Sequence, residues 1–162
     1  MKYQLKKFRK YAIRLFYYIY IIVLCYFLFF SESFGRVSSS EEYRYNLEFL
    51  SEIKRFIIHR RQVGFYAFFI NIAGNVIAFM PFGFLLPLLN ANYRGLFRVT
   101  IYSLLFSLAV EVIQMLSRVG AFDVDDILLN TLGGFLGYLL YAVHSLLHRV
   151  VQSSKGKGKK HD

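Results

Sequence analysis

The chain has 162 residues, of which 56% are hydrophobic and 19% aromatic, and its formal net charge at pH 7 is +10. A water-soluble domain of this length has no room to bury so much apolar surface, so the composition excludes an ordinary soluble protein. The basic residues flank apolar segments, which indicates a membrane protein and gives no reason to expect a nucleic-acid partner.

The first predicted element is a membrane-spanning helix over residues 11–30. A helix that crosses the hydrocarbon core needs about 20 mostly apolar residues, and this segment has that length. A basic segment precedes it, as in a cleavable signal peptide, but the apolar core is long and lacks a small-residue cleavage site, which favours an uncleaved helix. Cys25 is the chain's one cysteine, so no disulfide framework is expected and a buried, inert thiol is predicted.

The second predicted element is an amphipathic helix in the first outer loop, over residues 43–61. Charged residues such as Glu48, Lys54 and Arg55 lie off its apolar stripe, so the helix is expected to lie on the outer membrane surface. A soluble cap packed on the helical bundle is the alternative. The residues of the stripe are Asn46, Phe49, Leu50, Ile53, Phe56 and Ile57.

Three further apolar segments are long enough to span the membrane, namely residues 65–89, 97–117 and 126–148. Pro81 predicts a kink in the first of them, because proline removes a backbone hydrogen bond, and Pro87 predicts its end. The predicted fold is therefore all-α, a bundle of four transmembrane helices that forms a single domain over residues 1–152. Residues 153–162 are rich in lysine and glycine and predict a disordered basic tail, which either contacts anionic lipid or is simply solvated.

The charge distribution predicts how the chain is oriented. With the N-terminus inside, 13 of the 20 Lys and Arg residues fall on the inner side, accompanied by Asp162 as their one acidic residue. The outer segments then hold the other 7 basic residues beside 8 acidic ones. Because Lys and Arg gather on the cytoplasmic side of membrane proteins, we expect a multi-pass protein of a bacterial plasma membrane with both termini in the cytoplasm.

Several amide and ionisable side chains fall inside the predicted spans, where each is costly unless it faces protein or a wet cavity. Within each of the three later spans, these polar residues recur at helical spacing and so lie on one face of the helix. By their positions along the spans, all of them fall in the outer half of the bilayer. We therefore predict an outward-facing ligand pocket, with simple glue between helices as the alternative. The predicted pocket residues are Asn71, Asn75, Glu111, Gln114, Arg118, Asp123, Asp126 and Asn130.

Small residues on the same helices would let the helices approach closely, and Gly133 and Gly137 form a GxxxG pair of the kind that packs transmembrane helices. The predicted packing residues are Gly74, Ala78, Pro81, Gly83, Gly133, Gly134 and Gly137.

The outer turn over residues 120–126 contains three aspartates, yet no closing glutamate follows at the spacing of a calcium loop. We expect helix capping there, with no metal and no cofactor. Ser, Cys and His do not occur at catalytic spacing within the spans, and His144 and His148 are expected near the membrane interface. The sequence leaves open whether the protein is an enzyme.

Two motifs resemble the signatures of the VanZ-like family of small membrane proteins, named for a teicoplanin resistance accessory protein. For some members the resemblance implies a role in tolerance to glycopeptide or lipoglycopeptide antibiotics at the cell envelope, and it supplies no reaction. The similarity covers about residues 46–141. The motifs are Asn75-x-x-x-Phe79-x-Pro81-x-Gly83 and Glu111-x-x-Gln114 followed by Asp123-x-x-Asp126-x-x-x-Asn130-x-x-Gly133.

We therefore expect a cell-envelope membrane protein that engages a membrane lipid or lipid-like amphiphile through its outward-facing pocket. The amphiphile could be a lipid headgroup, a lipid-linked wall precursor or the lipid part of an antibiotic. One alternative is a membrane enzyme that modifies such a lipid, with Glu111 as general acid or base. Another is a packing partner of a second membrane protein through Gly133 and Gly137. The oligomeric state is left open.

Overall fold

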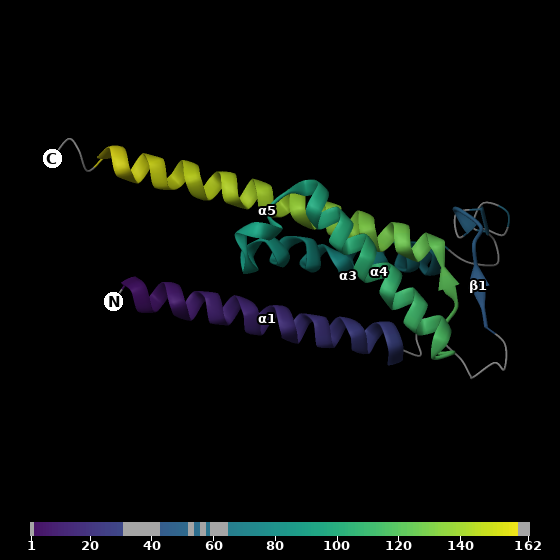
Figure 1. The fold of residues 1–162 in the computed structure, drawn as a ribbon. Helices are drawn as coiled ribbons and strands as arrows, with labels where there is room; N and C mark the ends of the chain where they lie inside the picture. The colour runs from purple at the N-terminus through teal and green to yellow at the C-terminus, as the bar shows by residue number, and fades with distance from the viewer. Residues whose placement is uncertain (1, 31–42, 52–53, 56–57, 59–64, 159–162) are drawn as a thin grey trace.

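The computed structural model describes residues 2–30, 43–51, 54–55, 58 and 65–158. It is almost entirely helical, which confirms the all-α prediction (Figure 1). The four long helices are α1 (Lys2–Phe30), α3 (Phe65–Leu89), α4 (Leu96–Leu116) and α5 (Val124–Gly158). The short elements are the 3-10 helix η2 (Ala91–Tyr93) and the two-residue strands β1 (Tyr45–Asn46) and β2 (Phe122–Asp123).

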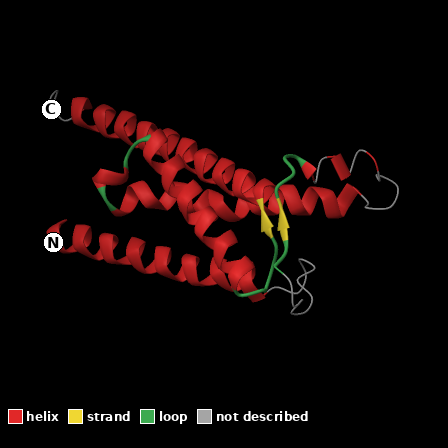
Figure 2. Ribbon diagram, turned by 45° about the vertical axis from the view of Figure 1, so that its right-hand side comes forward, coloured by secondary structure: helices red, strands yellow, loops and turns green. Residues whose placement is uncertain are grey.

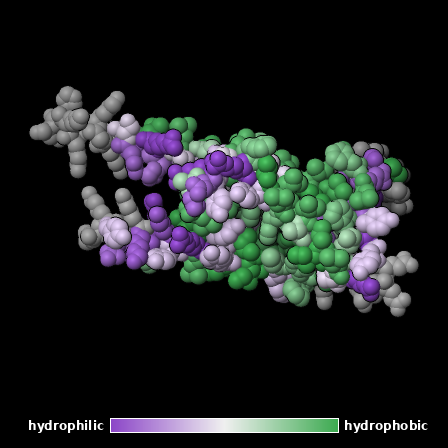
Figure 3. Space-filling view, viewed as in Figure 1, coloured by the Kyte–Doolittle hydropathy of each residue, from purple (hydrophilic) through white to green (hydrophobic). Residues whose placement is uncertain are grey.

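All four long helices are apolar enough and long enough to cross a membrane, judged by length and composition. Apolar side chains cover the middle of the molecule, and hydrophilic ones gather at its two ends (Figure 3). A surface of this kind suits a protein whose middle is surrounded by hydrocarbon. The predicted bundle of four transmembrane-length helices is therefore confirmed as a fold.

Two helices extend beyond the predicted spans. Helix α1 begins at Lys2, well before residue 11, and α5 continues to Gly158, where a disordered tail was expected from residue 153. Extending an existing helix costs far less free energy than starting one, and lysines suit a helix C-terminus electrostatically. Residues 159–162 of the expected tail lie outside the described residues.

Helices α3 and α5 pack so closely that glycine is required at their contact. A Cβ atom added at Gly83 would lie 1.9 Å from the Gly134 carbonyl oxygen, and one at Gly137 would lie 2.0 Å from the Met80 carbonyl oxygen. Gly133 is similarly close to the Val76 carbonyl oxygen, at 2.3 Å. The GxxxG face of α5 is thus covered by α3 within this chain.

Helix α4 packs on the same pair and completes the core. A Cβ atom at Gly134 would lie 1.9 Å from the Ser103 Oγ atom of α4. Phe82 of α3 and Phe106 of α4 stack with ring centroids 5.1 Å apart, beside the buried Leu86 and Val99. Tyr138 of α5 packs against this cluster, which gives the three helices a common apolar centre.

Helix α1 lies at the edge of the bundle and is held at separate points. The Tyr20 hydroxyl donates a hydrogen bond to the Ala78 carbonyl oxygen at 2.7 Å. Near the other end, the Gln114 amide donates to the Leu28 carbonyl oxygen, also at 2.7 Å. Most other large side chains of α1 are exposed, as expected of a helix that faces lipid.

The two ends of the bundle differ in structure. Both chain termini and η2 lie at one end, and the pair β1–β2 lies at the other (Figures 1 and 2). The strands pair in parallel, with Tyr45 opposite Phe122 and Asn46 opposite Asp123. We call β1, β2 and the described part of residues 43–58 the outer cap, after the orientation that the charge distribution predicts.

The amphipathic helix expected over residues 43–61 is only partly present. Residues 45–46 form a strand, because their backbone pairs with β2 and the Asn46 side chain accepts the Glu48 N–H at 3.1 Å, which favours a turn over a helix. Helical geometry begins at Ser51 and recurs at Lys54, Arg55 and Ile58. Residues 52–53, 56–57 and 59–64 lie outside the described residues.

Candidate functional site

Glu111 is the acid that the sequence places within a span, and it is buried in α4 with 2% of its surface exposed. Its Oε2 atom accepts a hydrogen bond from the Asp123 backbone N–H at 3.0 Å. Glu111 therefore ties the outer half of α4 to strand β2.

The three aspartates of the outer turn face three different segments. Asp123 accepts from the Asn46 amide at 3.0 Å, which joins β2 to β1. Asp125 accepts from the Leu50 N–H at 2.6 Å and from the Ser51 hydroxyl at 3.0 Å. Asp126 accepts from the amide of Asn75 on α3. The turn thus connects α3, α5 and the outer cap.

Asn46 is a second centre of this network. Its Nδ2 atom also approaches the Ser51 Oγ atom at 2.6 Å, and its Oδ1 atom accepts the Glu48 N–H. Leu50 has a left-handed backbone with φ 57°, which is rare for a residue that is not glycine, and its N–H is held by Asp125. Side chains of β1 and α5 therefore fix the loop that precedes Ser51.

Polar residues continue inward along α4 and α5. The Asn130 amide donates to the Ser107 hydroxyl at 2.9 Å, and both side chains are buried. The Asn130 Oδ1 atom is buried without a hydrogen-bond partner among the described residues. An unsatisfied acceptor of this kind costs about 1 to 3 kcal/mol. Hydrogen bonding therefore stabilises the contact between α4 and α5 at Asn130 less than it stabilises the outer turn.

The remaining predicted pocket residues lie outside this network of contacts. The guanidinium of Arg118 lies 5.2 Å from the centre of the Tyr43 ring, a cation–π contact at the base of the outer cap. Asn71 is half-buried on α3, one turn before Asn75. Gly74, predicted as a packing residue, would meet nothing within 4 Å among the described residues if it carried a Cβ atom.

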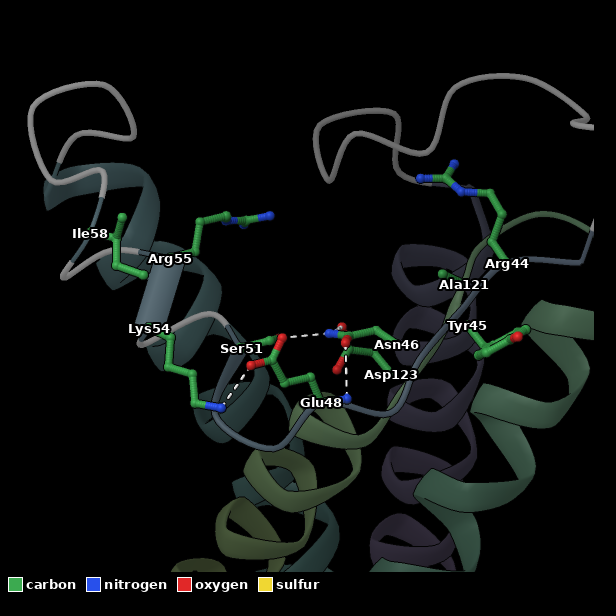
Figure 4. A pocket seen from close by; sticks show the side chains of 10 residues that line it. All are labelled: Arg44, Tyr45, Asn46, Glu48, Ser51, Lys54, Arg55, Ile58, Ala121 and Asp123. Atoms are coloured by element: carbon green, nitrogen blue, oxygen red, sulfur yellow. Dashed lines mark hydrogen bonds and ion pairs between the residues drawn. The ribbon is translucent and has the colours of Figure 1, made fainter.

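An open pocket of about 530 Å³ lies on the outer cap, above the network (Figure 4). Arg44 and Arg55 reach toward its opening from opposite sides, and Asn46, Ser51 and Asp123 lie lower in the view. The other lining residues are Tyr45, Glu48, Lys54, Ile58 and Ala121. Of these ten residues, Asp123 alone belongs to the pocket predicted from the sequence.

The charges of this pocket favour an anionic ligand. The Lys54 ammonium pairs with Glu48 at 2.7 Å, and both oxygens of Asp123 accept hydrogen bonds, from Asn46 and from the Asp125 N–H. Both acids of the pocket are therefore engaged within the protein, and two guanidinium groups, those of Arg44 and Arg55, line its opening. Planar guanidinium groups bind phosphate and carboxylate oxygens in pairs.

The described residues offer no group of three or more His, Cys, Asp and Glu side chains that could hold a metal ion. The aspartates of the outer turn instead accept hydrogen bonds from neighbouring segments. What the arrangement supports chemically is recognition by hydrogen bonds and charge.

The model of the VanZ/LLP1 family matches residues 16–147. The chain belongs to this family. It is also similar to Protein VanZ of Enterococcus faecium, with 42% identity over 77 residues. That alignment covers 46% of this chain and 46% of the relative, so it spans less than half of the relative's length. No solved structure matches the chain.

The contacts described above connect residues of the VanZ-like motifs to one another. Asn75 and Asp126, from different motifs, are hydrogen-bonded to each other, and Glu111 accepts a hydrogen bond from Asp123, the first aspartate of the outer turn. Gly83 and Gly133 allow the helices that carry these residues to approach. In this VanZ/LLP1 protein the motifs hold the outer turn and cap on the helical bundle.

Proposed function

We propose that this VanZ/LLP1 protein crosses a bacterial plasma membrane four times, with both termini in the cytoplasm and the outer cap on the external face. The excess of Lys and Arg in the terminal segments and in the loop around Asn92 supports this orientation. The shared position of both termini and η2 at one end is consistent with it (Figure 1).

The pocket on the outer cap then binds the anionic headgroup of an amphiphile in the outer leaflet. The observation that carries this proposal is that Arg44 and Arg55 approach one opening of the outer cap from opposite sides, which places two positive charges beside it (Figure 4). Two converging guanidinium groups suit a phosphate, a pyrophosphate or a carboxylate.

Apolar side chains beside the same opening suit the lipid part of the ligand. Ile58 is 72% exposed and Tyr45 is 68% exposed at the pocket, although both are large hydrophobic residues. Exposed aromatic and aliphatic residues at a membrane interface bury their surface against acyl chains. A headgroup alone would leave these side chains in water, so an amphiphile fits the surface better than a free anion.

Lipid-linked wall precursors and lipoglycopeptide antibiotics both combine an anionic group with a lipid chain. By engaging such a molecule at the outer surface, the protein would contribute to tolerance of antibiotics of the teicoplanin type, as the likeness to VanZ suggests. Binding of such an amphiphile in the cap pocket requires no bond to be broken. This agrees with a site whose groups offer charge and hydrogen bonds to a ligand.

The proposal is tested by the teicoplanin concentration that stops growth of cells that lack their own copy of the protein. Wild type should raise this concentration, and the double variant Arg44→Gln with Arg55→Gln should lose most of the protection. Arg149→Gln, which removes an exposed guanidinium at the opposite end, should keep it. Full protection by the double variant, at equal protein level in the membrane, would contradict the proposal.

A further inference from the structure

A second pocket, of about 390 Å³, lies at the inner end of the bundle, where α1 meets the end of α3 and η2. One guanidinium, Arg14, lines it together with three tyrosines, the Asn90 amide, and the apolar residues Leu86 and Leu89. The cavity thus combines a positive charge and hydroxyl groups with an apolar wall. None of these residues lines the pocket of the outer cap.

The way α1 is attached keeps this cavity in shape. Tyr17 lies against Phe82 of α3 with ring centroids 6.2 Å apart, and Tyr20 is hydrogen-bonded to α3 one turn further along. On the other side, Tyr93 of η2 packs edge-on against Tyr102 of α4, with ring centroids 5.4 Å apart. Tyr17 of α1 and Tyr93 of η2, which line the cavity beside Arg14, are thus each packed against a further helix of the bundle.

No carboxylate in the described part of the chain neutralises Arg14. The described acidic residues all lie at or beside the outer cap, at the opposite end of the bundle: Glu48, Glu111, Asp123, Asp125 and Asp126. The inner end instead adds further positive charge, with Lys10 one turn before Arg14 and with Arg94 after η2. A counter-charge for the cavity has to come from outside these residues.

We propose that this cavity binds one anionic phospholipid, with the lipid phosphate on the Arg14 guanidinium. A guanidinium offers two parallel N–H donors to a phosphate, and tyrosine hydroxyls and the Asn90 amide can donate further hydrogen bonds. Leu86 and Leu89 line the path for an acyl chain, which a free phosphate would leave unfilled. Basic pockets between membrane helices are well suited to lipid headgroups of this charge.

The bound lipid would close the gap between α1 and the rest of the bundle at this end, where protein contacts alone leave a cavity. It therefore acts as a bridge between α1 and α3. This site is independent of the proposed function, because it lies at the other end of the molecule and involves none of the outer-cap residues.

The test uses native mass spectrometry of the full chain, purified in a neutral detergent and titrated with phosphatidylglycerol or phosphatidylcholine. Wild type should bind one phosphatidylglycerol about tenfold more tightly than phosphatidylcholine, because the choline ammonium offsets the phosphate charge of phosphatidylcholine and is repelled by Arg14. Arg14→Gln should remove this preference. Lys10→Gln, the same loss of charge one turn away and outside the cavity, should change the affinity less than about twofold.

A second variant separates the loss of the lipid site from misfolding of the protein. Asn90→Asp keeps an oxygen that can accept the Asn92 N–H, as Asn90 does at 3.1 Å, but it places a negative charge in the cavity. It should also abolish the preference. Equal binding of the two lipids by wild type, or equal losses in Arg14→Gln and Lys10→Gln, would overturn the proposal. Displacement of the lipid by excess inorganic phosphate would identify a free-anion site and overturn it too.

Discussion

Glu111 shows how a costly residue in a membrane helix can be structural. An acid within a membrane span is costly even away from the middle of the bilayer, so its retention needs a compensating contact. The structure supplies one in the backbone N–H of Asp123, the first of the three aspartates in the outer turn. Strand β2 is only two residues long, so strand pairing offers few hydrogen bonds. The Glu111 side chain adds one more to this strand.

This arrangement predicts different effects for two substitutions of Glu111. Glu111→Ala removes the acceptor and should lower the free energy of unfolding by about 2 kcal/mol, whereas Glu111→Gln keeps a neutral acceptor and should lose less than half of that. Hydrogen exchange of residues 121–124 in detergent micelles measures both. The interpretation would be wrong if the alanine variant exchanged no faster than wild type.

At the scale of elements, the glycines explain why α3 and α5 form the closest pair. Helices in lipid gain little from apolar contact with each other, so close backbone approach supplies much of their attraction. The backbone oxygens of Met80 and Val76 occupy the space beside Gly137 and Gly133, and backbone atoms move less readily than flexible side chains. A methyl group at either position would clash with these backbone oxygens unless the two helices moved apart.

The chain offers a matched pair of glycine substitutions for testing this packing. Gly137→Ala should destabilise the bundle by about 3 kcal/mol, the upper range for overpacking, because the added carbon would lie 2.0 Å from a backbone oxygen. Gly74→Ala should be neutral or stabilising by up to about 1 kcal/mol, since alanine favours helix and no described atom lies within 4 Å of the added carbon. Equal thermal stability of the two variants in detergent would contradict this account.

The long helices could be predicted from the sequence, because apolar length is a local property that any 20-residue window reveals. The pairing of β1 with β2 was not predicted, since two-residue strands show no periodicity and their partners lie far apart along the chain. Asn46 was assigned to a helical stripe for the same reason, although its side chain bonds Asp123. The cap pocket was therefore missed, and Arg44 and Arg55 were not considered as site residues.

At the scale of the whole molecule, charge is separated along the bundle. The described acidic residues gather at or beside the outer cap, and the inner end holds basic residues without a described carboxylate. Such an asymmetry orients a protein in the membrane during insertion and leaves it beside anionic lipid on the cytoplasmic side. The proposed orientation and both proposed binding sites thus depend on one distribution of charge.

This distribution predicts the side on which the loop around Asn92 lies. A reporter that works only in the cytoplasm should be active when fused there, and one that works only outside should be inactive. The reverse pattern is expected for a fusion beside Glu48. Exchanged activities at the two positions would place the outer cap in the cytoplasm and reverse the topology.

The most direct test of the account is the affinity of the outer cap for an anionic amphiphile. Farnesyl pyrophosphate should bind the full chain in neutral nanodiscs about tenfold more tightly than it binds Arg44→Glu, because a guanidinium contact is replaced by repulsion. Farnesol, which has the same chain without the charge, should bind both proteins equally. Equal affinity of farnesyl pyrophosphate for wild type and Arg44→Glu would show that the cap pocket is no recognition site.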